Sequence, residues 1–370
     1  MRKDLQQDAF KVSITKKDDS DQYHKGRGAQ LNTHNRFLKN IFTREHHHGI
    51  DDWEDPKIST QYIKQQVKTI VNKVDSPDVG MSYSMNAYAG CEHGCIYCYA
   101  RNVHEYWGYS AGLDFERKIV VKLNAGEALR KQLSHPKWEC KPIMVSGNTD
   151  CYQPAEKKFR LTRSLLEVCN EFNQPIGMLT KSVGIVRDKD ILQDMASRKL
   201  ARVLISVTSF NEDLRRSMEP RTATASQRLY AMEELAKAGV PVGVMLGPMI
   251  PGLNDHEIHR IMKASAEAGA TFTAYTFIRL NGAIKVLFHD WLYKNMPDRA
   301  DKVWHFIEES HGGKVNDTRW GVRMRGEGHI ADIIAQQYRK YGEMYGMNKN
   351  VPVLDTTNFR KPGVVQGKLF

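Results

Sequence analysis

The sequence predicts an α/β protein built as a partial (β/α)6 TIM-like barrel, with a polar N-terminal extension and a helical C-terminal extension. Six short apolar runs, rich in β-branched residues, alternate with stretches of helical periodicity, which is typical of a parallel sheet covered by helices. No Gly-x-Gly-x-x-Gly fingerprint follows the first run, and this favours a barrel over a doubly wound sheet. The candidate strands are residues 82–89, 142–146, 176–180, 203–208, 242–246 and 272–277.

The stretches between these runs predict helices with one apolar face. In residues 156–172 apolar side chains recur every three or four positions. The stretch that begins at Thr224 has the same spacing, and Thr224 with Gln227 predicts a capping box at its start. Asn254 and Glu257 form a related pair ahead of a later helix. These signals agree with a strand–helix repeat.

The two ends differ from this middle part. We expect residues 1–60 to be a partly irregular extension, residues 61–285 to be the core domain, and residues 286–370 to be helical with a tail. The run of three histidines at 46–48 is expected to be a solvated loop that binds nothing. Further helices are expected at residues 284–295 and 298–310, and a last one is marked by Ile330, Ile333, Ile334, Tyr338, Tyr341 and Tyr345.

The composition is that of an ordinary globular protein. The 370 residues are 41% hydrophobic and 26% charged, which excludes wholesale disorder and fibres. The longest apolar run, residues 240–253, is broken by prolines and glycines, so no membrane span is expected. The first 17 residues lack an apolar signal segment, and we expect a cytoplasmic protein. The formal charge of +11 is spread over both ends and the core, so it supports a nucleic-acid partner only weakly.

Three of the six cysteines stand within eight residues, as C-x3-C-x2-C at the end of the first predicted strand. They are Cys91, Cys95 and Cys98. Such grouping disfavours a disulfide scaffold and indicates a metal or cluster site in a reducing compartment. Structural zinc takes four ligands, and His93 or His104 offers a fourth. Three thiolates also suit an iron–sulfur cluster that leaves one iron open, so both kinds of site stay under consideration.

The segment CEHGCIYCYAR, residues 91–101, resembles the cluster-binding loop of the radical S-adenosylmethionine (SAM) superfamily. That pattern is C-x3-C-x-aromatic-C, and Tyr97 supplies the aromatic residue. The resemblance is closer to a branch similar to spore photoproduct lyase, and it covers most of the chain. Further matching segments are Lys-Gly-Arg-Gly-Ala at 25–29, and residues 75–78, 149–154, 180–181, 218–221 and 324–328.

The resemblance implies that Cys91, Cys95 and Cys98 ligate a [4Fe–4S] cluster whose fourth iron binds the amino and carboxylate groups of SAM. One electron then cleaves the sulfonium bond, and the resulting 5′-deoxyadenosyl radical abstracts hydrogen from a substrate. A ferredoxin- or flavodoxin-type electron donor is implied as a partner. The substrate is open, and damaged DNA is suggested by analogy.

The resemblance also implies SAM contacts at the C-terminal ends of the strands. Ser146, Thr149 and Asp150 occupy the place of a motif that holds the SAM amino group, although its usual Gly-Gly-Glu is absent; ordinary turn chemistry is the alternative. Lys181 matches a lysine that meets the SAM carboxylate, and a solvated lysine is the alternative.

Two further residues have a cofactor role and a structural alternative. Ser206 is expected to reach the ribose of SAM, or to be a buried hydroxyl bonded to the backbone. Arg221 is expected to pair with the SAM carboxylate, or with Glu219. The pair Gly247-Pro248 is expected to lie against adenine or to form a turn.

The three remaining cysteines are scattered. Cys151 adjoins Asp150, and by resemblance it is a candidate for returning a hydrogen atom to a substrate radical; a small half-buried residue is the alternative. Cys169 is expected in the core, and Cys140 has no partner at useful spacing. The rival to a radical SAM enzyme is a non-enzymatic nucleic-acid-binding protein stabilised by zinc or a cluster.

Overall fold

The computed structural model describes residues 24–38 and 59–362. The expected N-terminal extension therefore falls largely outside the described residues, and the histidines at 46–48 lie outside them as well. No helix in the described part of the chain is long and apolar enough to cross a membrane.

The centre of the fold is a seven-stranded sheet in the order β10-β9-β8-β7-β6-β3-β2. Six of these strands run parallel and follow the chain order across the sheet, and β2 is antiparallel to β3 at one edge. This arrangement confirms the predicted partial (β/α)6 barrel. The strands are β2 Val71–Lys73, β3 Tyr83–Met85, β6 Ile143–Val145, β7 Ile176–Thr180, β8 Ala201–Ser206, β9 Val242–Met249 and β10 Phe272–Phe277.

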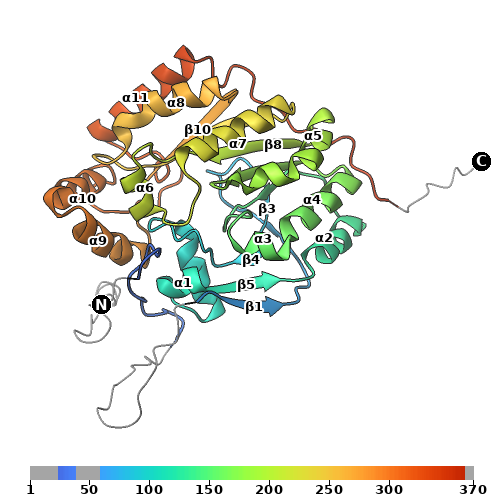
Figure 1. Ribbon diagram of the computed structural model, residues 1–370, viewed down its shortest axis with the longest axis horizontal. Coiled ribbons are helices and arrows are strands. Elements are labelled where there is room, and N and C mark those ends of the chain that lie inside the picture. The colour runs from blue at the N-terminus through green and yellow to red at the C-terminus, as the bar shows by residue number, and fades with distance from the viewer. Residues whose placement is uncertain (1–23, 39–58, 363–370) are drawn as a thin grey trace, which may run out of the picture.

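A second, three-stranded sheet in the order β1-β5-β4 lies below the barrel in Figure 1. It contains β1 Gln61–Gln65, β5 Lys118–Lys122 and β4 Tyr88–Ala89. The first predicted strand, residues 82–89, is therefore wrong as a single element. Its first half, β3, joins the barrel, whereas its second half pairs with β5 through Tyr88 and Val121. This change of sheet directs the chain into the cysteine loop.

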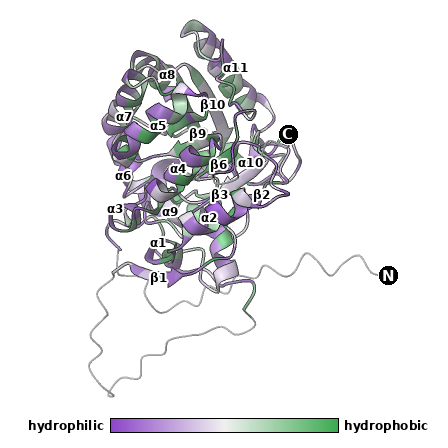
Figure 2. Ribbon diagram, turned by 90° about the vertical axis from the view of Figure 1, so that its right-hand side faces the viewer, coloured by the Kyte–Doolittle hydropathy of each residue, from purple (hydrophilic) through white to green (hydrophobic). Residues whose placement is uncertain are grey.

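Helices cover the outer face of the large sheet, and longer ones such as α5 and α8 show both hydrophobic and hydrophilic residues (Figure 1; Figure 2). Apolar side chains of these helices and of the strands form one continuous buried cluster. The helices before the last barrel strand are α1 Leu113–Arg117, α2 Ala125–Ser134, α3 Ala155–Phe159, α4 Leu161–Phe172, α5 Lys189–Ser197, α6 Glu212–Met218, α7 Ala225–Lys237 and α8 Ile258–Glu267. Among the described residues there are also 3₁₀ segments, namely η1 Tyr99–Trp107, η2 Val183–Asp188 and η3 Asp255–Glu257 before the last barrel strand and η4 Pro297–Arg299 after it.

The C-terminal region is helical, as predicted. It contains α9 Ile284–Asn295, α10 Ala300–Glu309 and α11 His329–Met344. Helix α11 packs beside α8 on the outside of the barrel (Figure 1). The segment between α10 and α11 returns to the sheet, where Phe277 at the end of β10 donates its N–H to the carbonyl of Met324.

The local signals were correct at one helix start and wrong at two other places. Thr224 and Gln227 form the predicted capping box of α7. The helix predicted over residues 156–172 is broken at Arg160, which adopts a left-handed φ of 53° and separates α3 from α4. Asn254 does not cap the following helix, because its amide binds the Ile250 N–H and the Thr208 and Pro248 carbonyls.

Candidate active site

The cysteine loop connects β4 to η1 and makes its tight turns at two glycines. Gly90 and Gly94 both adopt positive φ, 79° and 69°, a conformation that a side chain would strain. A β-carbon at Gly90 would also lie 2.9 Å from the Phe115 carbonyl oxygen. The backbone of the loop therefore lies tightly against the segment around Phe115, and this fixes where its three thiols emerge.

All three thiols of the loop are free and close to one another. Cys91 and Cys95 are buried, and Cys98 is half-buried. Burial raises the pKa of all three, and for Cys91 the charges of Asp150, Cys95 and Cys98 raise the pKa further. Mutually repelling thiolates at one buried point need a cation to stabilise them. The donor set therefore fits an iron-containing cluster, which binds thiolates.

A buried ion pair supports this loop from behind. Arg101 donates to the carbonyl oxygens of Gly94 at 3.0 Å and Cys95 at 2.9 Å, and it pairs with Glu116. Both charged side chains are fully buried. Removing one partner of such a pair would leave an uncompensated buried charge. The ion pair with Glu116 therefore holds Arg101 in place, and Arg101 in turn orients the carbonyl groups of the loop.

The N-terminal segment 24–30 packs onto the same support. Glu116 accepts the N–H groups of Gly28 at 3.0 Å and Ala29 at 2.8 Å. Arg27 donates to the backbone carbonyl of Glu116 at 2.6 Å. One carboxylate therefore joins this segment to Arg101 and, through it, to the cysteine loop.

Asp150 follows β6 and contacts the loop from the barrel side. Its carboxylate lies 3.3 Å from His93 Nδ1 and accepts the Thr180 hydroxyl and the Lys181 N–H, both at 2.8 Å. Burial alone would raise the pKa of Asp150, but the charge and hydrogen bonds of these neighbours lower it to about 2. Asp150 is therefore an ionised carboxylate next to Cys91.

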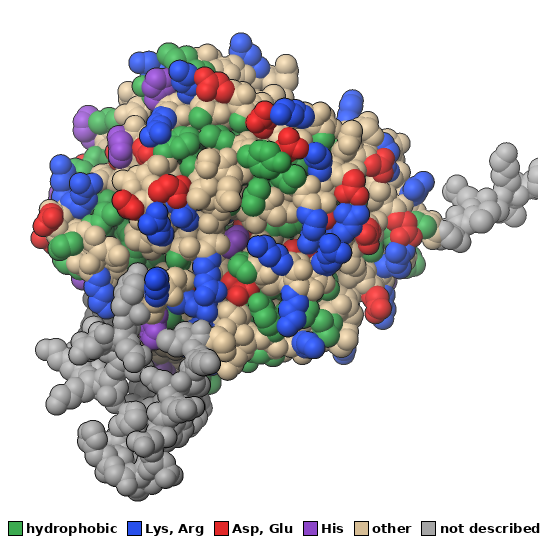
Figure 3. Space-filling view, in the orientation of Figure 1, with side chains coloured by type: hydrophobic (Ala, Val, Ile, Leu, Met, Phe, Trp, Pro, Cys, Tyr) green, Lys and Arg blue, Asp and Glu red, His purple; other side chains and the backbone are tan. Residues whose placement is uncertain are grey.

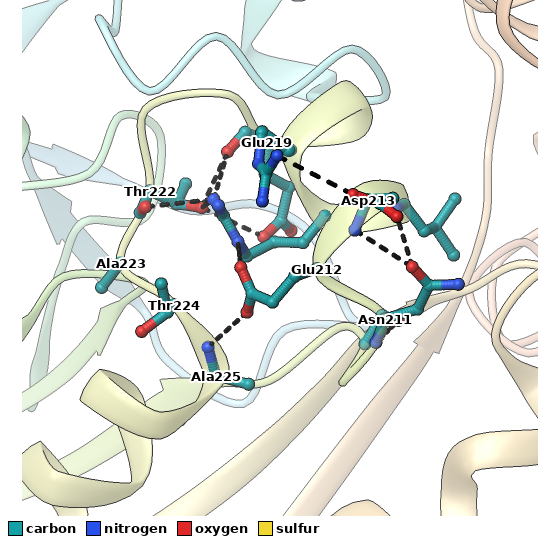
Figure 4. Close-up of polar contacts among 12 residues, drawn as sticks. Asn211, Glu212, Asp213, Glu219, Thr222, Ala223, Thr224 and Ala225 are labelled. Carbon is teal, nitrogen blue, oxygen red and sulfur yellow. Dashed lines mark hydrogen bonds and ion pairs between the residues drawn. The ribbon is translucent and has the colours of Figure 1, made fainter.

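Glu219, just after α6, is a second buried carboxylate, and its charge acts on Cys95. It accepts the hydroxyls of Tyr97 and Thr208 and pairs with Arg228. Burial raises the pKa of Glu219, whereas Arg228 and Lys181 lower it, and the result is about 2. Figure 4 shows Glu219 beside Thr222, and it shows Glu212 at the start of α6 accepting the Ala225 N–H.

Lys181 connects these two carboxylates, since its backbone N–H binds Asp150 and its charge acts on Glu219. Its Nζ lies 5.8 Å from the centroid of the Tyr97 ring, and its charge lowers the pKa of Cys95, Cys98 and Glu219. The predicted site residues Tyr97, Asp150 and Lys181 are therefore brought together around the thiols.

Ser206, at the end of β8, has a buried hydroxyl with no hydrogen-bond partner in the described part of the chain. Its carbonyl accepts Arg228 Nη1 at 3.0 Å, which places it in the Glu219 network. The alternative of a hydroxyl bonded to the backbone is therefore not what the structure shows. A buried polar atom without a partner costs free energy, and a bound ligand would supply the partner.

Ser146 and Thr149 shape the turn after β6. Ser146 has a positive φ of 71°, and its hydroxyl accepts the Cys151 N–H at 2.8 Å. Thr149 donates to the Tyr88 carbonyl at 2.9 Å, so the turn is tied to β4. Cys151 itself is only 2% exposed, and burial followed by the charge of Asp150 raises its pKa well above the usual value.

Arg221 does not pair with Glu219. Its Nε donates to the Gly26 carbonyl at 3.1 Å, and Nη1 lies 3.6 Å from the carboxylate of Glu92 in the cysteine loop. Arg221 therefore connects the N-terminal segment to the loop. The partner of Glu219 is Arg228, not Arg221. Gly247-Pro248 lies within strand β9 and has a cis peptide bond, so the alternative of a turn at this pair is wrong.

The two histidines considered as a fourth zinc ligand have other neighbours. His93 contacts Asp150, and the His104 ring lies against Tyr109 and Phe115. Within residues 24–38 and 59–362, no three His, Cys, Asp or Glu side chains are arranged to hold a single metal ion.

Sequence reasoning missed several residues of this site. Glu116 belongs to no motif. Arg101 and Gly28 lie within matching segments but were given no role, and Glu219 was considered only as a partner of Arg221. Tyr99, directly after Cys98, was also missed; it is 54% exposed, and its hydroxyl donates to the Gly147 carbonyl. The signal that was available is the position of Tyr99 at the end of the cysteine motif.

Comparisons with known proteins agree with this arrangement. The model of the Radical SAM superfamily matches residues 85–264. An uncharacterised protein of Mycobacterium bovis is 32% identical over 238 residues, which are 64% of this chain and 70% of the relative. One from Methanocaldococcus jannaschii is 27% identical over 243 residues, 66% of this chain and 86% of the relative. The structure of spore photoproduct lyase complexed with dinucleoside spore photoproduct has a TM-score of 0.57 at 17% identity, covering 77% of this chain and 80% of that one.

Proposed function

Since the chain belongs to the radical SAM superfamily, we propose that Cys91, Cys95 and Cys98 are the three protein ligands of its [4Fe–4S] cluster. One observation carries the assignment: the three thiols are free, Cys91 and Cys95 are buried, and the charges of the ionised Asp150 and Glu219 act on them. The cluster and SAM, when bound and reduced by one electron, supply a 5′-deoxyadenosyl radical that abstracts hydrogen from a substrate.

The residues around the thiols suggest how SAM is held. We propose that Lys181 meets the SAM carboxylate, because Asp150 accepts its backbone N–H and Tyr97 lies beside its ammonium group. Asp150 is the charged member of its turn and suits the SAM amino group, whereas Ser146 and Thr149 shape that turn. Ser206 donates to the ribose, which gives its unpartnered hydroxyl an acceptor.

Arg221 is better explained as a positioning residue of the loop than as a SAM ligand. Its guanidinium is already engaged by the Gly26 carbonyl and by Glu92. Lys181 then remains as the cation for the SAM carboxylate.

Cys151 is proposed as the hydrogen-atom donor that quenches the substrate radical. Its raised pKa keeps it in the S–H form, which is the form that can donate a hydrogen atom. The S–H bond breaks, a C–H bond forms on the substrate, and the sulfur-centred radical that remains takes up an electron and a proton supplied by the reductant.

A radical SAM enzyme needs a reductant, and we propose a ferredoxin- or flavodoxin-type protein in a reducing cytoplasm. For the substrate we propose damaged DNA. The likeness in fold to spore photoproduct lyase complexed with dinucleoside spore photoproduct supports this proposal, and so does the basic balance of the chain. Lysine and arginine are interspersed with acidic residues on the face seen in Figure 3, so non-specific attraction alone would be modest.

The test is anaerobic reconstitution with iron and sulfide, followed by dithionite and SAM, with chromatography for 5′-deoxyadenosine. We expect a brown protein that forms 5′-deoxyadenosine, and we expect Cys95→Ala to abolish product formation. Cys140→Ser is the matched control, since Cys140 is a free thiol outside the loop. Formation that persists in Cys95→Ala would refute the ligand assignment. Equal binding of ultraviolet-damaged and undamaged DNA at physiological salt would remove the repair proposal.

A further inference from the structure

A group of unsatisfied polar atoms lies just beyond the C-terminal end of β10, outside the thiol site. Four buried side-chain atoms there have no hydrogen-bond partner in the described part of the chain: Arg279 Nε, Asn281 Oδ1, His311 Nδ1 and Asn316 Oδ1. Buried polar atoms are nearly always satisfied in folded proteins, and each exception calls for an explanation. Four unsatisfied polar atoms on residues that lie close together indicate that a ligand binds there.

Backbone contacts hold these residues together. The Leu280 N–H donates to the Val315 carbonyl at 3.0 Å, which places residues 279–281 beside Asn316. His311 Nε2 lies 2.7 Å from the Ile278 carbonyl oxygen and must donate to it. His311 Nδ1 is then the acceptor of the neutral ring.

Arg279 is a half-buried cation that makes no direct ion pair in the described part of the chain, and Asp78 and Asp317 act on its charge only from a greater distance. No ion pair within 4 Å is found for it among residues 24–38 and 59–362, and Nη1 has only the Met324 sulfur at 3.8 Å. The neighbouring cation Arg323 is neutralised by Asp78 at 2.5 Å. An unpaired guanidinium in such surroundings is costly unless an anion binds it.

The exposed ring of Trp320 lies next to the guanidinium of Arg323. Arg323 stacks on Trp320 with 3.6 Å between its Cζ and the ring centroid, and Trp320 is 54% exposed. Indole faces of this kind stack nucleobases without regard to sequence.

The group also borders the candidate active site. Asn102 of η1, four residues after Cys98, donates to the Asn281 carbonyl at 2.9 Å and accepts the Ala283 N–H at 3.0 Å. A ligand held at Arg279 would therefore lie at the rim of the thiol site, where a substrate enters from the C-terminal ends of the strands.

We propose that Arg279, Asn281, His311 and Asn316, which we call the Arg279 subsite, bind a nucleotide unit of the substrate, with the phosphate on Arg279 and a base on Trp320. One cationic donor with three acceptors suits a nucleotide better than bare phosphate, because base and sugar supply the donors that the acceptors lack. This inference rests on the proposed function and adds the place on the protein where one nucleotide of the substrate binds. A nucleic-acid strand and a free nucleotide share this chemistry.

The test measures binding of a fluorescein-labelled single-stranded 12-mer by anisotropy at several salt concentrations, with reconstituted protein. We expect Arg279→Gln to weaken binding about tenfold and to reduce the slope of log affinity against log salt by about 0.7, as for one lost phosphate contact. Trp320→Ala should weaken binding about tenfold with an unchanged slope. Arg216→Gln, with a side chain 67% exposed on α6, is the matched control and should stay within about twofold.

Thermal melting of each variant excludes unfolding as the cause, and Arg279→Lys, which keeps the charge, should retain most of the salt slope. Displacement by thymidine monophosphate at equal affinity would identify a free nucleotide as the occupant; thymidine avoids competition for the adenosine pocket. If Arg279→Gln binds as tightly as Arg216→Gln, the subsite is wrong while the nucleic-acid substrate stands. If the wild-type protein binds neither the 12-mer nor thymidine monophosphate, the proposal of a nucleic-acid substrate is wrong as well. Formation of 5′-deoxyadenosine from SAM is a separate measurement, and it still tests the cluster ligands in that case.

Discussion

Gly28 lies directly against Gly94 of the cysteine loop. A β-carbon at Gly28 would be 1.9 Å from the Gly94 carbonyl oxygen and 3.1 Å from its carbonyl carbon. The same carbonyl accepts Arg101, which also holds Cys95. The N-terminal segment 24–30 therefore closes the outer side of the loop, and only a residue without a side chain fits at its centre.

We predict that Gly28→Ala impairs retention of the cluster. The methyl group must displace Gly94, and the displacement passes to Cys95 through the shared Arg101. We expect iron and sulfide content after reconstitution to fall at least several-fold, with faster bleaching in air. The measurement is iron and sulfide analysis with the iron–sulfur absorption band.

Gly80→Ala is the matched control, because a β-carbon at Gly80 meets nothing within 4 Å and its φ is not positive. It should keep the wild-type iron content. A Gly28→Ala protein that holds its cluster as firmly as Gly80→Ala would show that the segment is not needed to close the loop.

The strands that the sequence predicted well are those with continuous apolar runs. β7 and β10 match their predicted bounds: β7 is buried along nearly its whole length, and β10 is buried at both of its ends. β1 and β5 escaped notice because lysine and glutamine interrupt or flank their apolar residues, as in Gln-Tyr-Ile-Lys-Gln. Their apolar face is recognisable only once the two strands pair.

The candidate site was predictable only in its local part. The spacing of Cys91, Cys95 and Cys98 is a short-range pattern that the sequence displays. Glu116 contacts Gly28 across 88 positions, and no local signal connects two such residues. Arg160 interrupts the helix predicted over 156–172, although the sequence has no glycine or proline at that position. Contacts between residues far apart in the sequence, and a left-handed φ at a residue such as Arg160, depend on tertiary packing, which overrides local helix propensity.

Ser206→Ala should weaken SAM binding without destabilising the ligand-free protein. The Ser206 hydroxyl has no partner to lose in the described structure, so removing it relieves a buried unsatisfied group. Loss of one hydrogen bond to the ribose should raise the KM for SAM about three- to tenfold, with kcat little changed. Equilibrium dialysis with SAM and steady-state formation of 5′-deoxyadenosine provide the measurement.

Ser265→Ala is the control for this substitution. Ser265, on α8, is equally buried and its hydroxyl also lacks a partner, but it lies away from the strand ends. It should leave the KM for SAM unchanged. Equal KM values for the two variants would remove Ser206 from the SAM site.

Cys151→Ala should leave SAM cleavage intact and change the fate of the substrate. Without the thiol, the substrate radical lacks its nearest hydrogen donor and should react with other partners. Mass spectrometry of the products, with 5′-deoxyadenosine measured in parallel, provides the comparison. Cys169→Ala, which removes a buried thiol from the face of α4, is the control. Identical products from Cys151→Ala and the wild-type enzyme would end the donor proposal.

Glu219 should make the cluster-free chain sensitive to acid. Its pKa is about 2 in the folded state against a usual 4.5, a depressed value, so its stabilisation is complete above about pH 4.5 and is lost as pH falls towards 2. The shift corresponds to about 3 kcal/mol at neutral pH, of which about 2 kcal/mol is lost by pH 3. Urea unfolding at pH 6 and pH 3 should show this loss in the wild type and a smaller one in Glu219→Gln.

At pH 6 the Glu219→Gln chain should itself be less stable by about 3 kcal/mol, because Arg228 would be left as an uncompensated buried charge. Asp213→Asn, whose carboxylate is 94% exposed, should change the free energy of unfolding by no more than about 0.5 kcal/mol at either pH. If Glu219→Gln loses as much stability between pH 6 and pH 3 as the wild type, another carboxylate accounts for the acid sensitivity. The network of Glu219, Arg228 and Tyr97 would then owe its rigidity to hydrogen bonding rather than to the ionised carboxylate.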